Sequence, residues 1–91
     1  MRRLQAVISG RVQGVGFREF VRHEAASRGI TGYVCNSDDG QRVELVAEGD
    51  DVALAGLLDA LHEGPRFAKV ERVESEFSDA SGGFARFSVE L

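Results

Sequence analysis

The sequence has few residues that bind metals or form disulfides. Its 91 residues include one cysteine, Cys35, and two histidines, His23 and His62. A single cysteine excludes an intramolecular disulfide and any zinc site built from several cysteines. The two histidines fall in separate helical segments and form no metal-binding pair. We therefore expect no structural metal and interpret both histidines as surface or boundary residues.

Cys35 lacks the partner that would make it a phosphatase nucleophile. The Cys-x-x-x-x-x-Arg loop of cysteine-dependent phosphatases is absent, because Gln41 stands where the arginine would be. Strand alternation places Cys35 with Tyr33, on the face opposite Asn36. We interpret Cys35 as a semi-buried thiol. The alternative is a redox-sensitive thiol next to the candidate site that is described below.

Long apolar runs and low-complexity segments are also missing, and there is a single proline. No run approaches the roughly 18 apolar residues of a membrane span. The basic start, residues 1–5, leads into a polar, glycine-bearing stretch and not into the hydrophobic region of a secretion signal. With 43% hydrophobic and 29% charged residues, the chain has the balance of a globular protein. We predict one domain over residues 1–91, a cytoplasmic location and no membrane partner.

Apolar spacing predicts the order of the elements. Alternation predicts strands over 4–12, 31–36, 41–48 and 67–77, and a short last strand with Ala85, Phe87, Val89 and Leu91 on one face. Helical spacing predicts one helix from Phe17 that Gly29 ends, and another over 51–63. The resulting βαββαβ order predicts an α+β, ferredoxin-like sandwich: an antiparallel sheet with two helices on one face, plus a short C-terminal strand.

Three local signals refine this prediction. Asp39-Gly40 between two alternating runs predicts a hairpin. Asp50 and Asp51 precede the second helix, where they can cap it and favour its positive end. Val70 and Val73 have opposite parity within the fourth strand, which we interpret as a bulge.

The stretch from Gly10 to Arg18 connects the first strand to the first helix and carries the chemical signal. Gly14 and Gly16 allow backbone N–H groups to converge on a shared centre. The helix N-terminus adds unpaired N–H groups and partial positive charge. The planar guanidinium of Arg18 matches two phosphate oxygens. The loop therefore predicts a site for a phosphate-sized anion; the alternative is a tight connection without a ligand.

The two common glycine motifs do not fit this loop. A Walker A loop requires a lysine, and the loop has none. A dinucleotide-binding loop requires a third glycine, but Phe17, Arg18 and Glu19 follow Gly16. An anion site in this loop would therefore belong to another class.

Residues 10–18 resemble the signature of the acylphosphatase family, Gly-x-Val-Gln-Gly-Val-x-Phe-Arg, at every fixed position. Residues 32–36 read Gly-Tyr-Val-Cys-Asn and resemble the family's second motif, Gly-aromatic-Val-x-Asn. The spacing from Arg18 to Asn36 is also similar, and the resemblance covers essentially the whole chain. One departure is an apparent extra residue after Gly40, which we expect a bulge or a longer hairpin loop to absorb.

The resemblance implies a metal-independent hydrolase without a cofactor that converts acyl phosphates to a carboxylate and inorganic phosphate. Carried over by position, Arg18 would hold the phosphoryl group and Asn36 would position the attacking water. Backbone N–H groups would complete the phosphate-binding loop; they belong to Gln13, Gly14, Val15, Gly16, Phe17 and Arg18. The implied partner is a small-molecule acyl phosphate or an acyl-phosphorylated protein, and the implied state is a monomer.

Two other function classes share features with this sequence. The first is a non-enzymatic anion-binding or regulatory domain, but the intact Arg18 and Asn36 favour an enzyme. The second is an RNA-binding module, because RNA-recognition domains share the βαββαβ order. Residues 41–47 carry no aromatic side chain for base stacking, and the net charge is −4. We therefore expect no nucleic acid partner.

Overall fold

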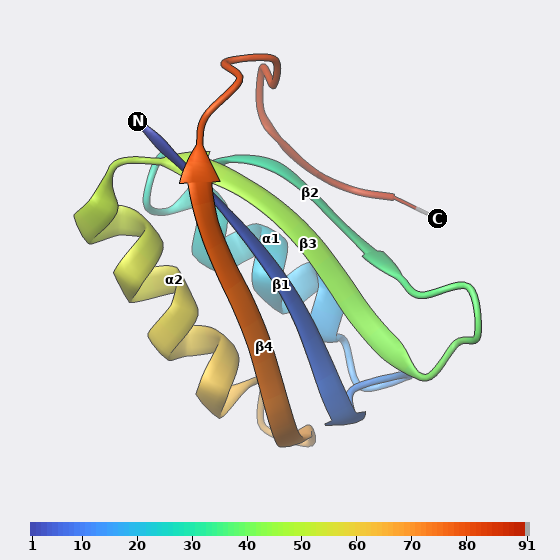
Figure 1. Cartoon of the computed structure of the whole chain (residues 1–91). Helices are drawn as coiled ribbons and strands as arrows, with labels where there is room; N and C mark the ends of the chain where they lie inside the picture. Colours follow the sequence, from blue (N-terminus) through green and yellow to red (C-terminus); the bar gives the residue numbers. More distant parts are fainter. Residues whose placement is uncertain (91) are drawn as a thin grey trace.

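The computed structural model describes residues 1–90 and contains five strands and two helices (Figure 1). The strands are β1 (Arg2–Arg11), β2 (Thr31–Asn36), β3 (Arg42–Gly49), β4 (Lys69–Asp79) and β5 (Phe87–Val89); the helices are α1 (Phe17–Ala26) and α2 (Asp51–Glu63). The predicted βαββαβ order with a short final strand is confirmed. The bounds of β2 and α2 agree with the prediction, and the others differ by a few residues. Leu91 lies outside the described residues.

The strands form one sheet in the order β4-β1-β3-β2-β5. The central strands β1 and β3 are antiparallel to each other, β4 is antiparallel to β1, and β2 is antiparallel to β3. The four main strands are therefore antiparallel, as predicted. The short C-terminal strand β5, whose direction the sequence left open, pairs with β2 in parallel and makes the complete sheet mixed. The reason is the path of residues 80–86, which carry the chain past one end of the sheet to the opposite edge (Figure 1).

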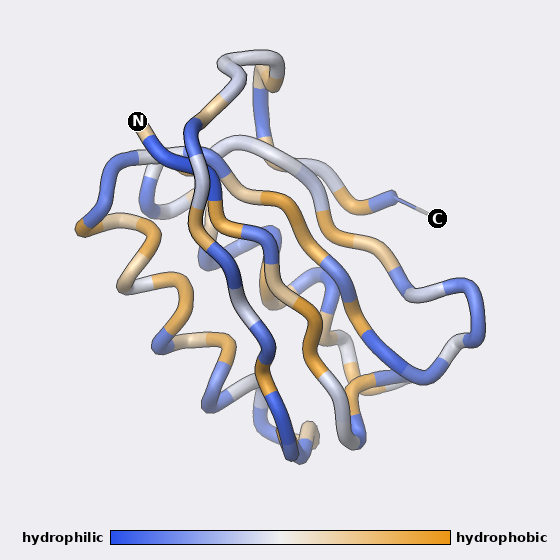
Figure 2. Tube along the Cα trace, in the orientation of Figure 1, coloured by the Kyte–Doolittle hydropathy of each residue, from blue (hydrophilic) through white to orange (hydrophobic). Residues whose placement is uncertain are grey.

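Both helices lie on one face of the sheet (Figure 1). The hydrophobic core lies between this face and the two helices. Alternation along the strands supplies one side of this core, as the switching colours of the tube show (Figure 2). The strand side includes Leu4, Ala6, Ile8, Val43, Leu45 and Ala47, and the helix side includes Phe17, Val21, Ala25, Leu54, Leu57 and Leu61. The opposite face of the sheet carries no helix, and we call it the open face.

A bulge in β4 explains the irregular parity of its valines. The register between β1 and β4 shifts between Ser9 and Gly10, which leaves Glu71 without a partner on β1. The bulge expected from Val70 and Val73 is therefore confirmed, and both side chains pack against the core. A Cβ atom on Gly10 would lie 2.3 Å from a backbone oxygen of β4. Glycine is thus required where β1 meets the bulge.

The hairpin between β2 and β3 has a loop longer than the two-residue turn. The Ser37 N–H donates to the carbonyl of Arg42 at 2.8 Å, and the Arg42 N–H donates to the Ser37 hydroxyl at 3.0 Å. Gly40 turns the chain with a φ of 71°. Asn36 and Val43 pair in regular register just before the loop. The loop of residues 37–41 therefore leaves the end of β2 undisturbed.

α2 begins and ends as its sequence predicts. The Asp50 carboxylate accepts a hydrogen bond from the N–H of Ala53 at 3.4 Å, which is the expected cap. Gly64 ends the helix with a φ of 71°. Over residues 1–90, neither helix has the length and hydropathy that crossing a membrane would require.

Replacing Gly32 with alanine is expected to destabilise the sheet strongly. Gly32 has a φ of 137°, and a Cβ there would lie 1.9 Å from the carbonyl oxygen of Val46 on β3. We expect the free energy of unfolding to fall by about 3 kcal/mol or more, measured by urea denaturation. Gly40→Ala is the control, because Gly40 also has positive φ but nothing within 4 Å, and it should cost about 1 kcal/mol. An equal fall in the free energy of unfolding in the two variants would contradict the explanation by the close approach of Gly32 to Val46.

Candidate active site

The loop between β1 and α1 leaves a series of backbone N–H groups without acceptors. Gly14 and Gly16 have φ values of 70° and 76°, in the left-handed region. Gly16 is the N-cap of α1, and no side chain caps the helix. Phe20 is the first residue after Val12 whose N–H finds a backbone acceptor; among residues 1–90, the N–H groups from Gln13 to Glu19 have none. Such a series at a helix N-terminus is a ready anion site.

The loop is fastened at both ends. Val12 is buried and its N–H donates to the carbonyl of Gly10 at 3.0 Å. The Gln13 amide donates to the carbonyl of Arg42 on β3 at 2.9 Å. Phe17 is buried in the core, and its ring meets that of Phe20 edge-on at 5.9 Å. These contacts hold the loop in shape before any ligand binds.

A pocket of about 220 Å³ opens at this loop. It is lined by Val12, Gly14, Gly16, Phe17, Arg18, Glu19, Asn36 and Val89. The structure thus brings together the two residues singled out from the sequence, Arg18 and Asn36, although they come from different elements. Gln13 and Val15, which were also predicted, belong to the loop but not to the lining of the pocket.

Asn36 reaches the pocket because it is the last residue of β2. It shares the helix-facing side of the strand with buried Gly32 and Val34, and it is itself half-buried. Among residues 1–90, its side-chain amide has no hydrogen-bond partner. Its donor and acceptor atoms therefore remain available to a ligand or water in the pocket.

Three lining residues were not found from the sequence: Val12, Glu19 and Val89. Val12 was recognised as a strand residue and as a fixed position of the family signature, but not as a binding residue, and Val89 was interpreted only as part of the last strand. Val89 enters the pocket because β5 pairs with β2 in parallel, which local patterns do not encode. Glu19 could have been noticed from its spacing to Arg22, which is that of an ion pair on one helix face.

Glu19 places a carboxylate beside the anion pocket, and Arg22 neutralises it. The Arg22 Nε donates to the Glu19 carboxylate at 2.8 Å. This hydrogen bond, with the nearby positive charge, lowers the pKa of Glu19, so the carboxylate is ionised and paired. The pair limits the repulsion that Glu19 would otherwise exert on a bound anion.

Arg22→Ala is expected to weaken phosphate binding about two- to fivefold, because it leaves the Glu19 charge unpaired at an exposed site. The measurement is an NMR titration with inorganic phosphate at low salt. Arg28→Ala is the matched control: Arg28 pairs with Glu24 at 3.0 Å, and neither lines the pocket. Equal effects of the two substitutions would contradict the proposed role of the Glu19–Arg22 pair.

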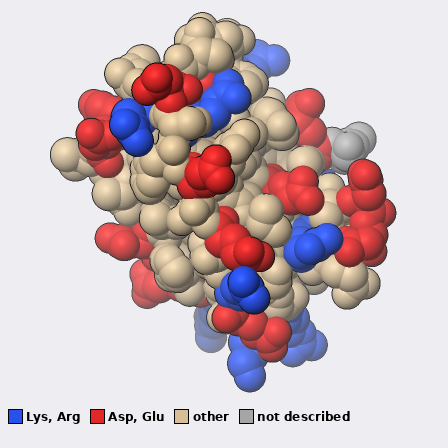
Figure 3. Space-filling view, in the orientation of Figure 1, with Lys and Arg blue, Asp and Glu red and all other residues tan. Residues whose placement is uncertain are grey.

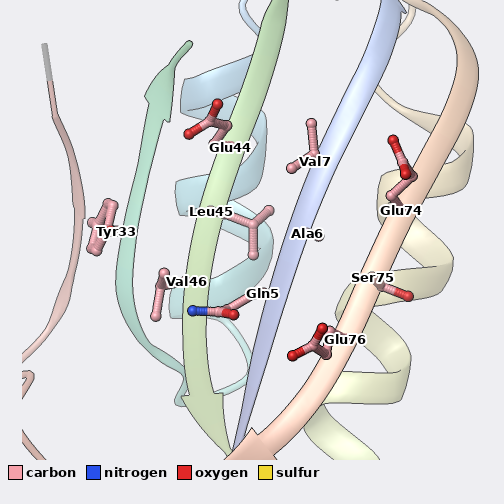
Figure 4. Close-up of a pocket in the computed structure, with 10 residues that line it drawn as sticks. All are labelled: Gln5, Ala6, Val7, Tyr33, Glu44, Leu45, Val46, Glu74, Ser75 and Glu76. Atoms are coloured by element: carbon pink, nitrogen blue, oxygen red, sulfur yellow. The ribbon is translucent and has the colours of Figure 1, made fainter. Parts of the chain in front are cut away.

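A second hollow of about 480 Å³ lies on the open face of the sheet (Figure 4). Its lining includes Val7, Tyr33, Glu44, Glu74 and Glu76. Acidic side chains lie across this face of the molecule (Figure 3). They would repel a phosphate group, so the smaller pocket at the glycine loop is the better candidate for an anion site.

Cys35 faces the open side of the sheet, opposite Asn36, as predicted. Burial raises the pKa of the Cys35 thiol, and the negative charges of Glu44, Glu90 and Asp38 raise it further. The thiol is therefore protonated at neutral pH, which is the poorly nucleophilic form. His23 and His62 are both exposed. Over residues 1–90, no three side chains of the metal-binding types come together.

Comparison with known proteins agrees with the fold and with the family resemblance of the sequence. The family model for acylphosphatase matches residues 4–89. An acylphosphatase from Salinibacter ruber is 51% identical over 88 residues, which cover 97% of this chain and 92% of that protein. One from Thermus thermophilus is 49% identical over 82 residues, covering 90% and 92%. The crystal structure of acylphosphatase from Bacillus subtilis is 43% identical with a TM-score of 0.94 and covers 100% of both chains. The chain therefore belongs to the acylphosphatase family.

Proposed function

We propose that this protein hydrolyses the carboxyl–phosphate bond of acyl phosphates to a carboxylate and inorganic phosphate. The observation that carries the proposal is that one pocket joins the unpaired N–H groups of the glycine loop, the guanidinium of Arg18 and the amide of Asn36. Together these provide donors for a phosphoryl group and a polar group for a water beside it. Family membership supports the same chemistry.

The loop and Arg18 would bind the phosphoryl group. Phosphoryl transfer spreads negative charge over the equatorial oxygens, and catalysis is mainly positioning and stabilisation of that charge. We assign the N–H groups from Gln13 to Arg18, at the N-terminal end of α1, to the phosphoryl oxygens. The contacts that hold the loop in shape before binding would keep the reorganisation small. Arg18 adds a planar pair of charged donors that does not depend on pH.

The leaving group explains why so few side chains are needed. The acyl phosphate releases a carboxylate, whose conjugate acid has a pKa of about 4. It can depart without a general acid, so neither a histidine nor a metal-bound water is required for this step. The exposed histidines and the protonated Cys35 thiol are consistent with such a mechanism.

Asn36 would orient the attacking water. An amide is too weak a base to abstract a proton, but its carbonyl can accept a hydrogen bond from water and its N–H₂ can donate to a phosphate oxygen. Asn36 lines the same pocket as Arg18. We assign it orientation of water for in-line attack on the phosphoryl group.

The substrate class follows from the size and openness of this site. The pocket of about 220 Å³ is large enough for a phosphoryl group, and we place the acyl group outside it. We infer that the substrate is a small acyl phosphate or an acyl-phosphorylated protein side chain. Three predictions from the sequence remain predictions: the protein is a monomer, it is located in the cytoplasm, and it has no nucleic acid partner.

The direct test is hydrolysis of benzoyl phosphate by the purified protein, with and without EDTA. We expect turnover that chelation does not change, since every proposed group belongs to the chain. A phosphate monoester with a phenolic leaving group is the control substrate; it should react far more slowly, because a phenolate leaves less readily. Phosphate binding without turnover would instead indicate an anion-binding domain and would refute the proposed activity.

A further inference from the structure

Glu48, near the end of β3, is buried where the sheet pattern predicts exposure. Its neighbours Ala47 and Leu45 belong to the helix-facing core, and Arg3 on β1 pairs with it across the open face. Its side chain is nevertheless only 1% exposed. A buried carboxylate requires several donors to offset the loss of water.

The chain supplies those donors from two sides. Arg3 Nε donates to Glu48 Oε2 at 2.8 Å, and the second Arg3 nitrogen lies at 2.7 Å. The Ser81 N–H and hydroxyl donate to the same oxygen at 2.9 and 3.0 Å, and the Gly82 N–H donates to Oε1 at 2.9 Å. The Ser81 and Gly82 N–H groups, Arg3 and the Ser81 hydroxyl outweigh the effect of burial and lower the pKa of Glu48 to about 2. The carboxylate is thus ionised near neutral pH.

The bound segment is the start of the crossing loop, residues 80–86, which joins one edge of the sheet to the other (Figure 1). Further along this loop, the ring of Phe84 packs 5.8 Å from the Arg3 guanidinium and 5.9 Å from the ring of Tyr33. The carbonyl of Arg86 then accepts a hydrogen bond from Gly32 at 3.0 Å. Glu48 and Arg3 therefore fix the position from which the last strand begins.

The last strand leads from this loop to the candidate active site. β5 has three residues and pairs with β2 alone. The Glu90 N–H donates to the carbonyl of Val34 at 2.8 Å. Val89 lines the pocket, and the Glu90 carbonyl accepts a long contact of 3.4 Å from the Arg18 guanidinium. A strand of three residues depends on contacts other than its pairing with β2 to hold its position.

We infer that Glu48 is a remote positioning residue for the active site: it holds the crossing loop, which sets β5, which in turn holds Val89 and the Glu90 carbonyl against Arg18. This inference rests on the proposed role of Arg18 in binding the phosphoryl group. Glu48 touches neither substrate nor Arg18. Its effect passes through the backbone of residues 81–90.

The test is Glu48→Gln, compared with Asp50→Ala. The glutamine keeps the shape of the side chain, but its NH₂ group must face either the N–H of Gly82 or the donors of Arg3 and Ser81. Asp50→Ala is also expected to destabilise the protein, through the cap of α2. Among residues 1–90, the Asp50 carboxylate accepts a hydrogen bond from the N–H of Ala53 and from no group of the crossing loop or β5. Kinetics with benzoyl phosphate and competitive inhibition by phosphate are measured at a temperature where each variant is fully folded.

For Glu48→Gln we expect kcat/KM to fall about tenfold and the inhibition constant of phosphate to rise by a similar factor, because Arg18 loses its fixed orientation. Hydrogen exchange at the Glu90 amide should accelerate, while amides in α2 keep their protection. Asp50→Ala should leave both kinetic constants within about twofold and accelerate exchange in α2 instead. Ser81→Ala removes one donor to Glu48 and should show smaller changes of the same kind as Glu48→Gln. It replaces Glu48→Gln in the test if the Glu48→Gln variant fails to fold.

If folded Glu48→Gln has the same kcat/KM and the same inhibition constant of phosphate as Asp50→Ala, the inference is overturned. If only Ser81→Ala folds, unchanged kinetics and unchanged Glu90 exchange in that variant would overturn it as well. Failure of the proposed function is distinguishable, because wild-type protein would then not hydrolyse benzoyl phosphate at all. Phosphate titration of wild type and variants still reports on the orientation of Arg18 in that case.

Discussion

Arg18→Ala is expected to lower kcat/KM for benzoyl phosphate by about 10³-fold or more and to weaken phosphate binding as well. Arg18 is the cationic side chain in the lining of the pocket, which it shares with Gly14, Gly16 and Asn36. Removing an arginine that stabilises a transferring phosphoryl group costs about 10³ to 10⁵ in kcat. The measurement is steady-state hydrolysis of benzoyl phosphate, with phosphate as competitive inhibitor.

The fold should tolerate this substitution. The Arg18 side chain is half-buried and makes one long contact, to the Glu90 carbonyl. The thermal midpoint should therefore change little, and a large drop would mean that lost activity reports lost structure. Arg18→Lys separates charge from geometry: we expect it to regain part of the phosphate affinity but little of the turnover, because an ammonium is not a planar pair of donors. Wild-type-like kinetics in Arg18→Ala would refute the role of Arg18.

Much of the fold is predictable because short-range patterns match the structure locally. The alternation of Val43, Leu45 and Ala47 places the core side of β3, and all three are buried. Asp50 predicts the start of α2 from the chemistry of its cap. The opposite parity of two valines even predicts the bulge in β4. In each case the cause lies within a few residues of its effect.

The candidate site is predictable in part for the same reason. The glycines that shape the loop and the arginine beside them are neighbours in the sequence, so the anion site follows from a single stretch. Asn36 comes from another strand, and it was assigned through the family motif and not through geometry. The structure places Asn36 and Arg18 at one pocket; their catalytic roles are proposals that substitution at these two positions can test.

The remaining features depend on long-range pairing. Val89 enters the pocket through a parallel pairing with β2 that no local pattern signals. Glu48 occupies a position that alternation assigns to the open face, and the crossing loop buries it. The parallel strand and the buried carboxylate share one origin, which is the path of residues 80–86 across the end of the sheet. A pattern-based prediction cannot specify such a path, because a loop carries little periodicity.

Asn36→Ala is expected to lower kcat by about 10²- to 10³-fold while phosphate binding changes by no more than about threefold. A misplaced water loses the advantage of a fixed, near-attack geometry, whereas the phosphoryl group is still held by the loop and Arg18. The measurement pairs single-turnover hydrolysis of benzoyl phosphate with an NMR titration of inorganic phosphate. Among residues 1–90 the Asn36 amide has no hydrogen-bond partner, so the substitution should have little effect on stability.

Two further variants make the contrast with Arg18 decisive. Asn36→Asp keeps the shape of the side chain but places a carboxylate at the pocket, so it should weaken phosphate binding through repulsion. Gln41→Ala removes an exposed amide from the neighbouring hairpin. It should leave kcat and the dissociation constant of phosphate within about twofold of wild type. Because binding and turnover respond separately, the two roles are distinguishable: loss of Arg18 must reduce both, and loss of Asn36 must reduce turnover alone. An Asn36→Ala variant that loses phosphate binding but keeps its turnover would show that the amide binds the anion and does not orient the water.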